Sequence, residues 1–172
     1  MSARAESPVR LSGTAATAGL ARVRRASLVA LVLVVAEYVI GMYVNLYATI
    51  PRADHGHDVG TAISNGPAML SIHAVAGLLL GLGALGVLVQ AIRSRRPAVI
   101  AWSAAGLVAL AMASVAGAGF TSTGDRSASM AMSVLTGVAL VCYAANIYLV
   151  RLSSPPALPP RGRAAADRPR RA

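Results

Sequence analysis

Residues 27–49 read SLVALVLVVAEYVIGMYVNLYAT, and this stretch decides the fold. It is longer than the ~20 residues that an α-helix needs to cross the ~30 Å hydrocarbon core of a bilayer. It does not alternate between apolar and polar residues as barrel strands do. Three further apolar stretches follow, at about residues 68–92, 98–120 and 128–150. Because a backbone in lipid must satisfy its own hydrogen bonds, the sequence predicts an all-α, four-helix transmembrane bundle.

The composition agrees with a membrane protein. Of the 172 residues, 56% are hydrophobic and only 13% are charged, whereas a soluble domain carries roughly 25% charged residues. This argues against a water-soluble enzyme and against a disordered chain, which would be far less hydrophobic. The single cysteine, Cys142, excludes a disulfide framework within one chain and a cysteine-rich zinc site.

The arginines set the expected orientation of the four spans. All 16 basic residues are arginine, and only Arg52 and Arg126 lie on the side of the predicted bundle opposite to the rest. Arginine-rich flanks stay on the cytoplasmic side, so we expect a multi-pass protein of the cell membrane with both termini in the cytoplasm. The net charge of +10 then reflects topology first and attraction to anionic lipid second, and nucleic acid is not an expected partner.

Two basic tails flank the predicted transmembrane domain, which covers residues 26–151. The tails are residues 1–25, of which 1–21 are small and polar without an apolar period, and residues 152–172, of which 153–172 are rich in proline and arginine. Such segments cannot form a packed core, so both are predicted to be disordered cytoplasmic tails.

Glu37 is the most informative residue of the first span because it lies near the expected bilayer midplane. An ionised acid costs at least ~2.5 kcal/mol at that depth and usually marks a functional site or a specific pairing. Gly41 and Asn45 follow at helical spacing, which places all three on one polar stripe facing the bundle interior. Two interpretations stay open. Glu37 is either a protonated acid hydrogen-bonded to a neighbouring helix, or a proton or cation site together with Asn45.

His73 begins a second stripe, with Gly77 and Gly81 at helical spacing, and such small residues allow helices to approach closely. His73 is therefore predicted to face another helix. Counting depth from the ends of the apolar stretches predicts a contact between Asn45 and His73, either direct or through water, and puts Glu37 level with Gly81. The glycines expected at helix contacts are Gly41, Gly77, Gly81 and Gly137.

The loop after the first span contains a cluster of possible metal ligands, Asp54, His55, His57 and Asp58. Histidine and carboxylate together can bind a divalent transition metal, and the loop could fold back toward His73 to complete a metal or haem site. Polar loops also collect these residue types in order to turn and stay hydrated. A haem held by two histidines would need a second histidine in a span, and the other spans contain none. The leading expectation is therefore no cofactor.

The end of the first span, Tyr43-Val-Asn-Leu-Tyr-Ala-Thr-Ile-Pro51, is followed by a short loop with histidines and then by His73-Ala-Val-Ala-Gly-Leu-Leu. This order resembles a group of small four-helix integral membrane proteins of actinobacteria, over roughly residues 26–150. The resemblance implies a fold and a membrane location but no activity.

The segment Ala36-Glu37-Tyr-Val-Ile-Gly41 is also similar to the small multidrug resistance family, whose four-helix members carry a membrane glutamate in the first helix. Compared with that family, this sequence has a longer first loop, positive charges concentrated on one side of the predicted bundle, and additional terminal tails. The glycine-rich pattern of that family's third helix is not evident. These departures weaken the case for drug export by Glu37.

No nucleophile–base arrangement and no phosphate-binding loop is visible, so the chain is not expected to be an enzyme. The leading prediction is an accessory or interaction subunit that associates with a membrane-protein partner or with a second copy of itself. One alternative is a small proton-coupled transporter in which Glu37 titrates. The other is a metal or haem binder on the outer face that uses His55, His57 and His73.

Overall fold

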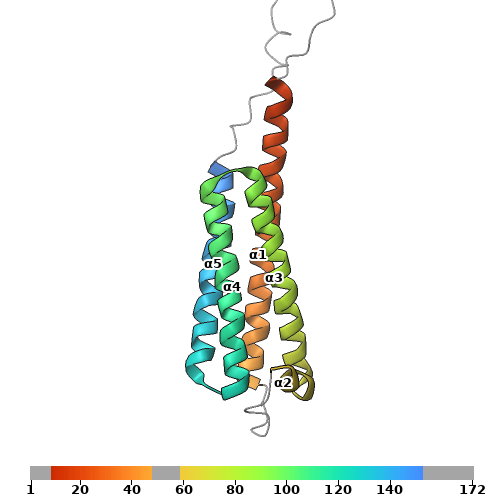
Figure 1. The fold of residues 1–172 in the computed structure, drawn as a ribbon, viewed down its shortest axis with the longest axis vertical. Helices are drawn as coiled ribbons and strands as arrows, with labels where there is room; N and C mark the ends of the chain where they lie inside the picture. The colour runs from red at the N-terminus through yellow and green to blue at the C-terminus, as the bar shows by residue number, and fades with distance from the viewer. Residues whose placement is uncertain (1–8, 48–58, 153–172) are drawn as a thin grey trace, which may run out of the picture.

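The computed structural model describes residues 9–47 and 59–152, and these form helices joined by short connections. The helices are α1 (Val9–Tyr47), α2 (Val59–Asn65), α3 (Ala68–Ser94), α4 (Pro97–Thr123) and α5 (Arg126–Leu152). The four long helices lie side by side, and the short α2 lies at one end of them (Figure 1). α1 packs against α3 and α5, and α4 also packs against α3 and α5. These four contacts close an all-α bundle, as predicted.

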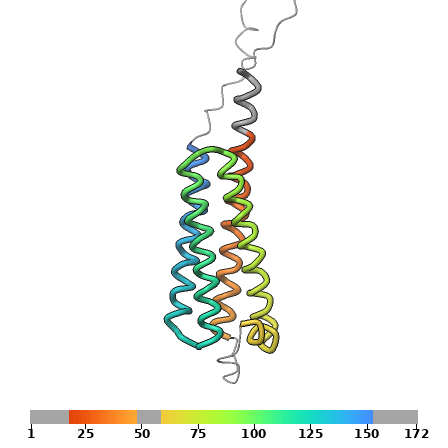
Figure 2. The backbone as a smooth tube through the Cα atoms, viewed as in Figure 1, coloured from red at the N-terminus to blue at the C-terminus, as the bar shows by residue number. Residues whose placement is uncertain are grey.

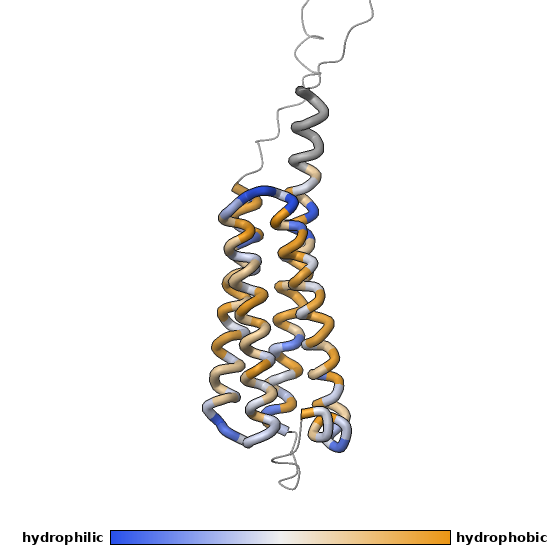
Figure 3. The backbone as a smooth tube through the Cα atoms, viewed as in Figure 1, coloured by the Kyte–Doolittle hydropathy of each residue, from blue (hydrophilic) through white to orange (hydrophobic). Residues whose placement is uncertain are grey.

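The outer surface of the bundle is apolar, as the lipid interior requires. Within the described residues, four helical segments are long and apolar enough to cross a membrane: Ala18–Tyr47, Ala68–Ser94, Pro97–Thr123 and Arg126–Leu152. Large aliphatic side chains such as Leu78 and Val115 point outward and are more than half exposed. Hydrophobic residues cover most of each long helix, with hydrophilic ones gathered at the two ends (Figure 3). The chain thus has the build of a multi-pass membrane protein.

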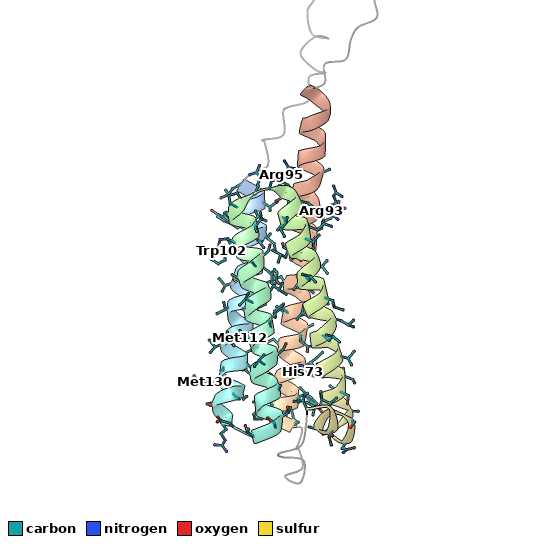
Figure 4. All side chains as sticks on the ribbon, in the orientation of Figure 1. His73, Arg93, Arg95, Trp102, Met112 and Met130 are labelled. Carbon is teal, nitrogen blue, oxygen red and sulfur yellow. The ribbon has the colours of Figure 1, made fainter. Side chains whose placement is uncertain are left out.

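The two ends of the bundle differ in charge. We call the end with the α3–α4 connection the arginine end, because Arg93, Arg95 and Arg96 lie there (Figures 3 and 4). Arg95 adopts a left-handed conformation with φ of 55° and donates its backbone N–H to Ile92 O, which stops α3. Pro97 then opens α4, where its missing N–H removes no helical hydrogen bond. The other end, with α2 and the α4–α5 connection, is called the opposite end.

The α4–α5 connection is built from a glycine and an aspartate. Gly124 ends α4 at φ 70°, in the left-handed region that favours glycine, and its N–H bonds Phe120 O. Asp125 then caps α5, since its Oδ1 accepts the Ser127 N–H at 2.9 Å and its Oδ2 accepts the Ser127 hydroxyl at 2.6 Å. These two hydrogen bonds from Ser127 hold the pKa of Asp125 below its ordinary value.

Replacing Asp125 by Ala is expected to lower the thermal stability slightly at neutral pH. Because its pKa is lowered in the fold, the carboxylate stabilises the fold above the pKa of the unfolded chain, and this contribution is lost as the pH falls through the folded pKa. Thermal unfolding in detergent across acidic pH measures the effect. Asp125→Asn is the control, because it keeps an acceptor oxygen but does not titrate. An Asp125→Ala protein that matches the wild type at every pH would contradict the cap.

The N-terminal part of α1 corrects one prediction. α1 begins at Val9, so the disorder predicted for residues 1–25 is wrong from residue 9 onward. Leu20 and Val23 are buried and belong to a cluster at the arginine end with Ala91, Val99 and Val150. Their spacing continues through Ala30 and Val34, but the interposed arginines lower the local hydropathy and hide the helical period. Of the predicted C-terminal tail, Leu152 belongs to α5 and residues 153–172 lie outside the described residues.

The short helix α2 was not predicted. It ends at Asn65-Gly66-Pro67, a common way to stop one helix before the next. A Cβ at Gly66 would lie only 2.5 Å from Ala62 O, so this turn needs glycine. Ser71 at the start of α3 donates its hydroxyl to Ile63 O at 2.9 Å, which ties α2 to the bundle. The backbone path in Figure 2 shows α2 folded against the end of α3.

Candidate functional site

The candidate site is a contact between an acid and a histidine inside the bundle. Glu37 on α1 places Oε1 2.7 Å from Nδ1 of His73 on α3. The side chains are 11% and 23% exposed, respectively. Both atoms are buried, and neither has another hydrogen-bond partner among the described residues. Glu37 and His73, two ionisable side chains that would be costly to expose to lipid, thus contact each other (His73 is labelled in Figure 4).

Two glycines make room for this pair. A Cβ at Gly41 would lie 2.9 Å from Cε1 of His73, and a Cβ at Gly77 would lie 3.4 Å from Oε1 of Glu37. Each helix therefore presents a glycine to the polar side chain of the other, which supports the prediction for these two glycines. Gly81 and Gly137 are different, because a Cβ at either would have no atom within 4 Å. They do not mark close helix contacts.

The register of α1 against α3 differs by one helical turn from the predicted one. Glu37 lies against Gly77 instead of Gly81, and His73 pairs with Glu37 instead of Asn45. The physical reason is that the ends of an apolar stretch define a membrane boundary only to within about a turn. Complementary packing of the two side chains against the two glycines fixes the register.

Asn45 takes part in the site from another side. Its Oδ1 accepts the hydroxyl of Ser129 on α5 at 3.0 Å. Asn45, Ser129, Ser133 and Thr136 line a cavity of about 50 Å³ that Glu37 and His73 also line. A polar cavity of this size has room for ordered water, since one water needs only ~10–15 Å³ of such volume. The pair therefore adjoins a small polar chamber. Ser129 and Ser133 lie one helical turn apart on α5, and this spacing is the sequence signal that could have indicated the chamber.

A second, larger space reaches the pair from the side of α3 and α4. This cleft has a volume of about 510 Å³ and runs between α3 and α4, with α1 and α5 behind it and α2 at one end. Its walls are mostly apolar, formed by residues such as Leu80, Leu110 and Phe120. Ligand pockets commonly have volumes of ~300–1,000 Å³ and mostly apolar walls with few polar groups. No local pattern in the sequence predicts this cleft, because it depends on how far two helices stand apart.

An apolar core separates the site from the arginine end. Val34, Ala84 and Ala139 are fully buried and pack with Leu80 and Leu110 in one cluster. Val34 lies about one turn from Glu37 toward the arginine end. The small cavity therefore lies on the side of this core away from the arginine end, whereas the large cleft runs along the core residues Leu80 and Leu110 as far as Leu85 and Leu107.

A second buried polar group lies beyond that core. Asn146 on α5 donates its Nδ2 hydrogen to the hydroxyl of Ser103 on α4 at 2.8 Å. Ser27 Oγ, Tyr143 OH and Asn146 Oδ1 are buried without a hydrogen-bond partner among the described residues. Buried polar groups left in this way are typical positions for ordered water.

The predicted metal ligands Asp54, His55, His57 and Asp58 lie outside the described residues. In the part of the chain that is described, no three metal-binding side chains of histidine, cysteine, aspartate or glutamate lie together. His73, which was to complete that site, has its Nδ1 directed at Glu37.

Comparisons with known protein families, with curated proteins and with solved structures give no match for this chain. The fold and the site together define the class: a four-span membrane bundle with an acid–histidine pair in its interior.

Proposed function

We propose that this protein is a small proton-coupled membrane transporter in which Glu37 and His73 form the proton-binding site. The observation that carries the proposal is the 2.7 Å contact between Oε1 and Nδ1 at the meeting point of a polar cavity and a large cleft. Two lone pairs at that distance would repel, so one proton lies between the two atoms. Carboxyl and imidazole groups are the side chains that most readily exchange protons near neutral pH.

The surroundings favour exchange over a purely structural role. A pair that only held helices together would be enclosed by other side chains. Stability alone would also not require it, because replacing a buried pair by aliphatic residues of similar volume often leaves the fold equally stable. Here Glu37 and His73 both face a chamber large enough for water, and His73 is 23% exposed. A chamber with room for water at the pair and a packed apolar core between that chamber and the arginine end support a site that exchanges protons with one side at a time. The positive-inside rule supports a cytoplasmic arginine end, and with that orientation the polar chamber would belong to the outer half of the membrane.

Glu37→Gln provides the test. Infrared difference spectra of the protein in lipid, recorded between acidic and alkaline pH, should contain a carboxyl C=O band that is absent in Glu37→Gln. In vesicles with an imposed membrane potential, proton flux should fall in this variant to the level of protein-free vesicles. Ser129→Ala is the matched control, because it changes the same chamber without removing a titrating group. A C=O band that does not change between about pH 4 and about pH 10 would overturn the proposal.

An accessory subunit is a second candidate, and one observation favours it. α3 is the span with the smallest buried share, and its aliphatic side chains Leu78, Leu79 and Leu82 are all at least 59% exposed. A helix of a partner or of a second copy would cover this face. Under this alternative, which also involves no catalysis, a stoichiometric partner co-purifies with the protein and Glu37→Gln leaves the function intact.

A further inference from the structure

We propose that the cleft between α3 and α4 binds an uncharged amphipathic molecule that enters from the lipid and places a hydrogen-bonding head group at Glu37 and His73. This inference deepens the proposed function, on which it rests, because it names the class of substrate. Three features of the cleft carry it: its opening toward lipid, its small-residue walls and its charge.

The cleft opens on the lipid-facing surface of the bundle. Leu78 and Leu85 of α3 line it and are also 67% and 48% exposed. Toward the arginine end, α3 and α4 are joined by a tight turn, and toward the opposite end Val59 and Ile63 of α2 line the cleft. Between these limits the cleft reaches inward to Gly41 and Val44 of α1, the helix that lies behind α3 and α4 in the view of Figure 1. A ligand therefore reaches the cleft sideways from the bilayer.

Small residues keep the cleft open. Ser114, Gly117 and Ala118 on α4 and Gly77 and Gly81 on α3 all line it. This explains why a Cβ at Gly81 would meet nothing within 4 Å. Close helix packing would normally use such small residues to bring two backbones together. Here the backbones stay apart, and an apolar body in the cleft would supply the missing contacts.

The charge of the cleft selects the head group. Glu37 and His73 are the charged or titratable side chains among its described lining residues, and they contact each other. With one proton between them, the two groups are either a neutral acid beside a neutral imidazole or a carboxylate beside an imidazolium. The pair carries no net charge in either state. A permanently charged head group would leave an uncompensated charge in an apolar site, which is costly. The pair offers one donor and one acceptor, which suits a hydroxyl, carbonyl or amide.

Fluorescence quenching of the protein in lipid nanodiscs tests the inference. In a Trp102→Phe background, Leu78→Trp places an indole at the mouth of the cleft. Leu79→Trp, the adjacent position at nearly the same depth, is 61% exposed in the wild type and does not line the cleft. The probes are bromododecanol, bromododecane and bromododecyl trimethylammonium, whose bromine quenches indole on contact. Leu85→Trp and Leu82→Trp repeat the comparison if a bulky side chain at 78 blocks the mouth.

We expect bromododecanol to give saturable quenching for Leu78→Trp, above the linear quenching by lipid-dissolved probe that both variants share. It should bind about tenfold more tightly than bromododecane, as expected for one or two net hydrogen bonds. Adding Gly81→Leu, which fills open space, should remove the saturable part. Tighter binding of the trimethylammonium probe, equal binding of bromododecane, no saturation, or insensitivity to Gly81→Leu would each overturn the inference. None of these readouts needs a proton gradient, so they fail or succeed independently of the Glu37→Gln test.

Discussion

His73→Leu is expected to destabilise the folded bundle by about 3–5 kcal/mol when the pair is ionised, because it leaves a buried carboxylate without its partner. The atom that loses its partner is Oε1 of Glu37, which has no other hydrogen-bond partner among the described residues. Leucine fills a volume similar to that of imidazole, so the cost comes from the unpaired charge and not from a cavity. Unfolding in mixed detergent micelles, followed by circular dichroism, measures the loss.

The double variant Glu37→Leu/His73→Leu separates stability from function. Replacing both members of a buried pair by aliphatic side chains often costs nothing, so the double variant should regain stability to within about 1 kcal/mol of the wild type. It should still lack the infrared carboxyl band and the proton flux, because no titrating group remains at the site. If His73→Leu is as stable as the wild type, the contact is not a buried charged pair. If the double variant retains proton flux, the pair does not carry the proton.

Gly41→Ala is expected to break the same contact without touching either polar residue. The added Cβ would lie 2.9 Å from Cε1 of His73, closer than such atoms approach one another, so the ring has to move away from Glu37. Overpacking of this kind costs about 1–3 kcal/mol. The nitrogen NMR shift of His73 Nδ1 should report the lost contact directly.

Gly81→Ala is the matched control on α3, because its Cβ would meet no atom within 4 Å. Alanine favours a helix over glycine by roughly 0.5–1 kcal/mol, so this control should be neutral or slightly stabilising. Equal effects at positions 41 and 81 would contradict the close approach of Gly41 to His73.

The candidate site was only partly predictable, as His73 illustrates. Its place in a stripe with Gly77 correctly predicted a residue that faces another helix, and Glu37 was expected to face the interior. Which partner each would meet depended on the axial register of α1 against α3. Hydropathy varies too gradually along a span to determine that register. For this reason the depth count predicts Asn45 as the partner of His73, whereas the structure has Glu37 in contact with His73. Asn45 instead accepts a hydrogen bond from Ser129 on α5.

The sequence by itself determined the four apolar helices and their all-α bundle, because a backbone in lipid has few ways to satisfy its hydrogen bonds. It also determined that Glu37 and His73 avoid lipid, since a charge exposed there is costly. Only the tertiary structure decided that these two residues meet across Gly41 and Gly77 and that α3 and α4 stand apart around a cleft. Those features depend on side-chain fit between helices distant in sequence, which no local period of the chain encodes.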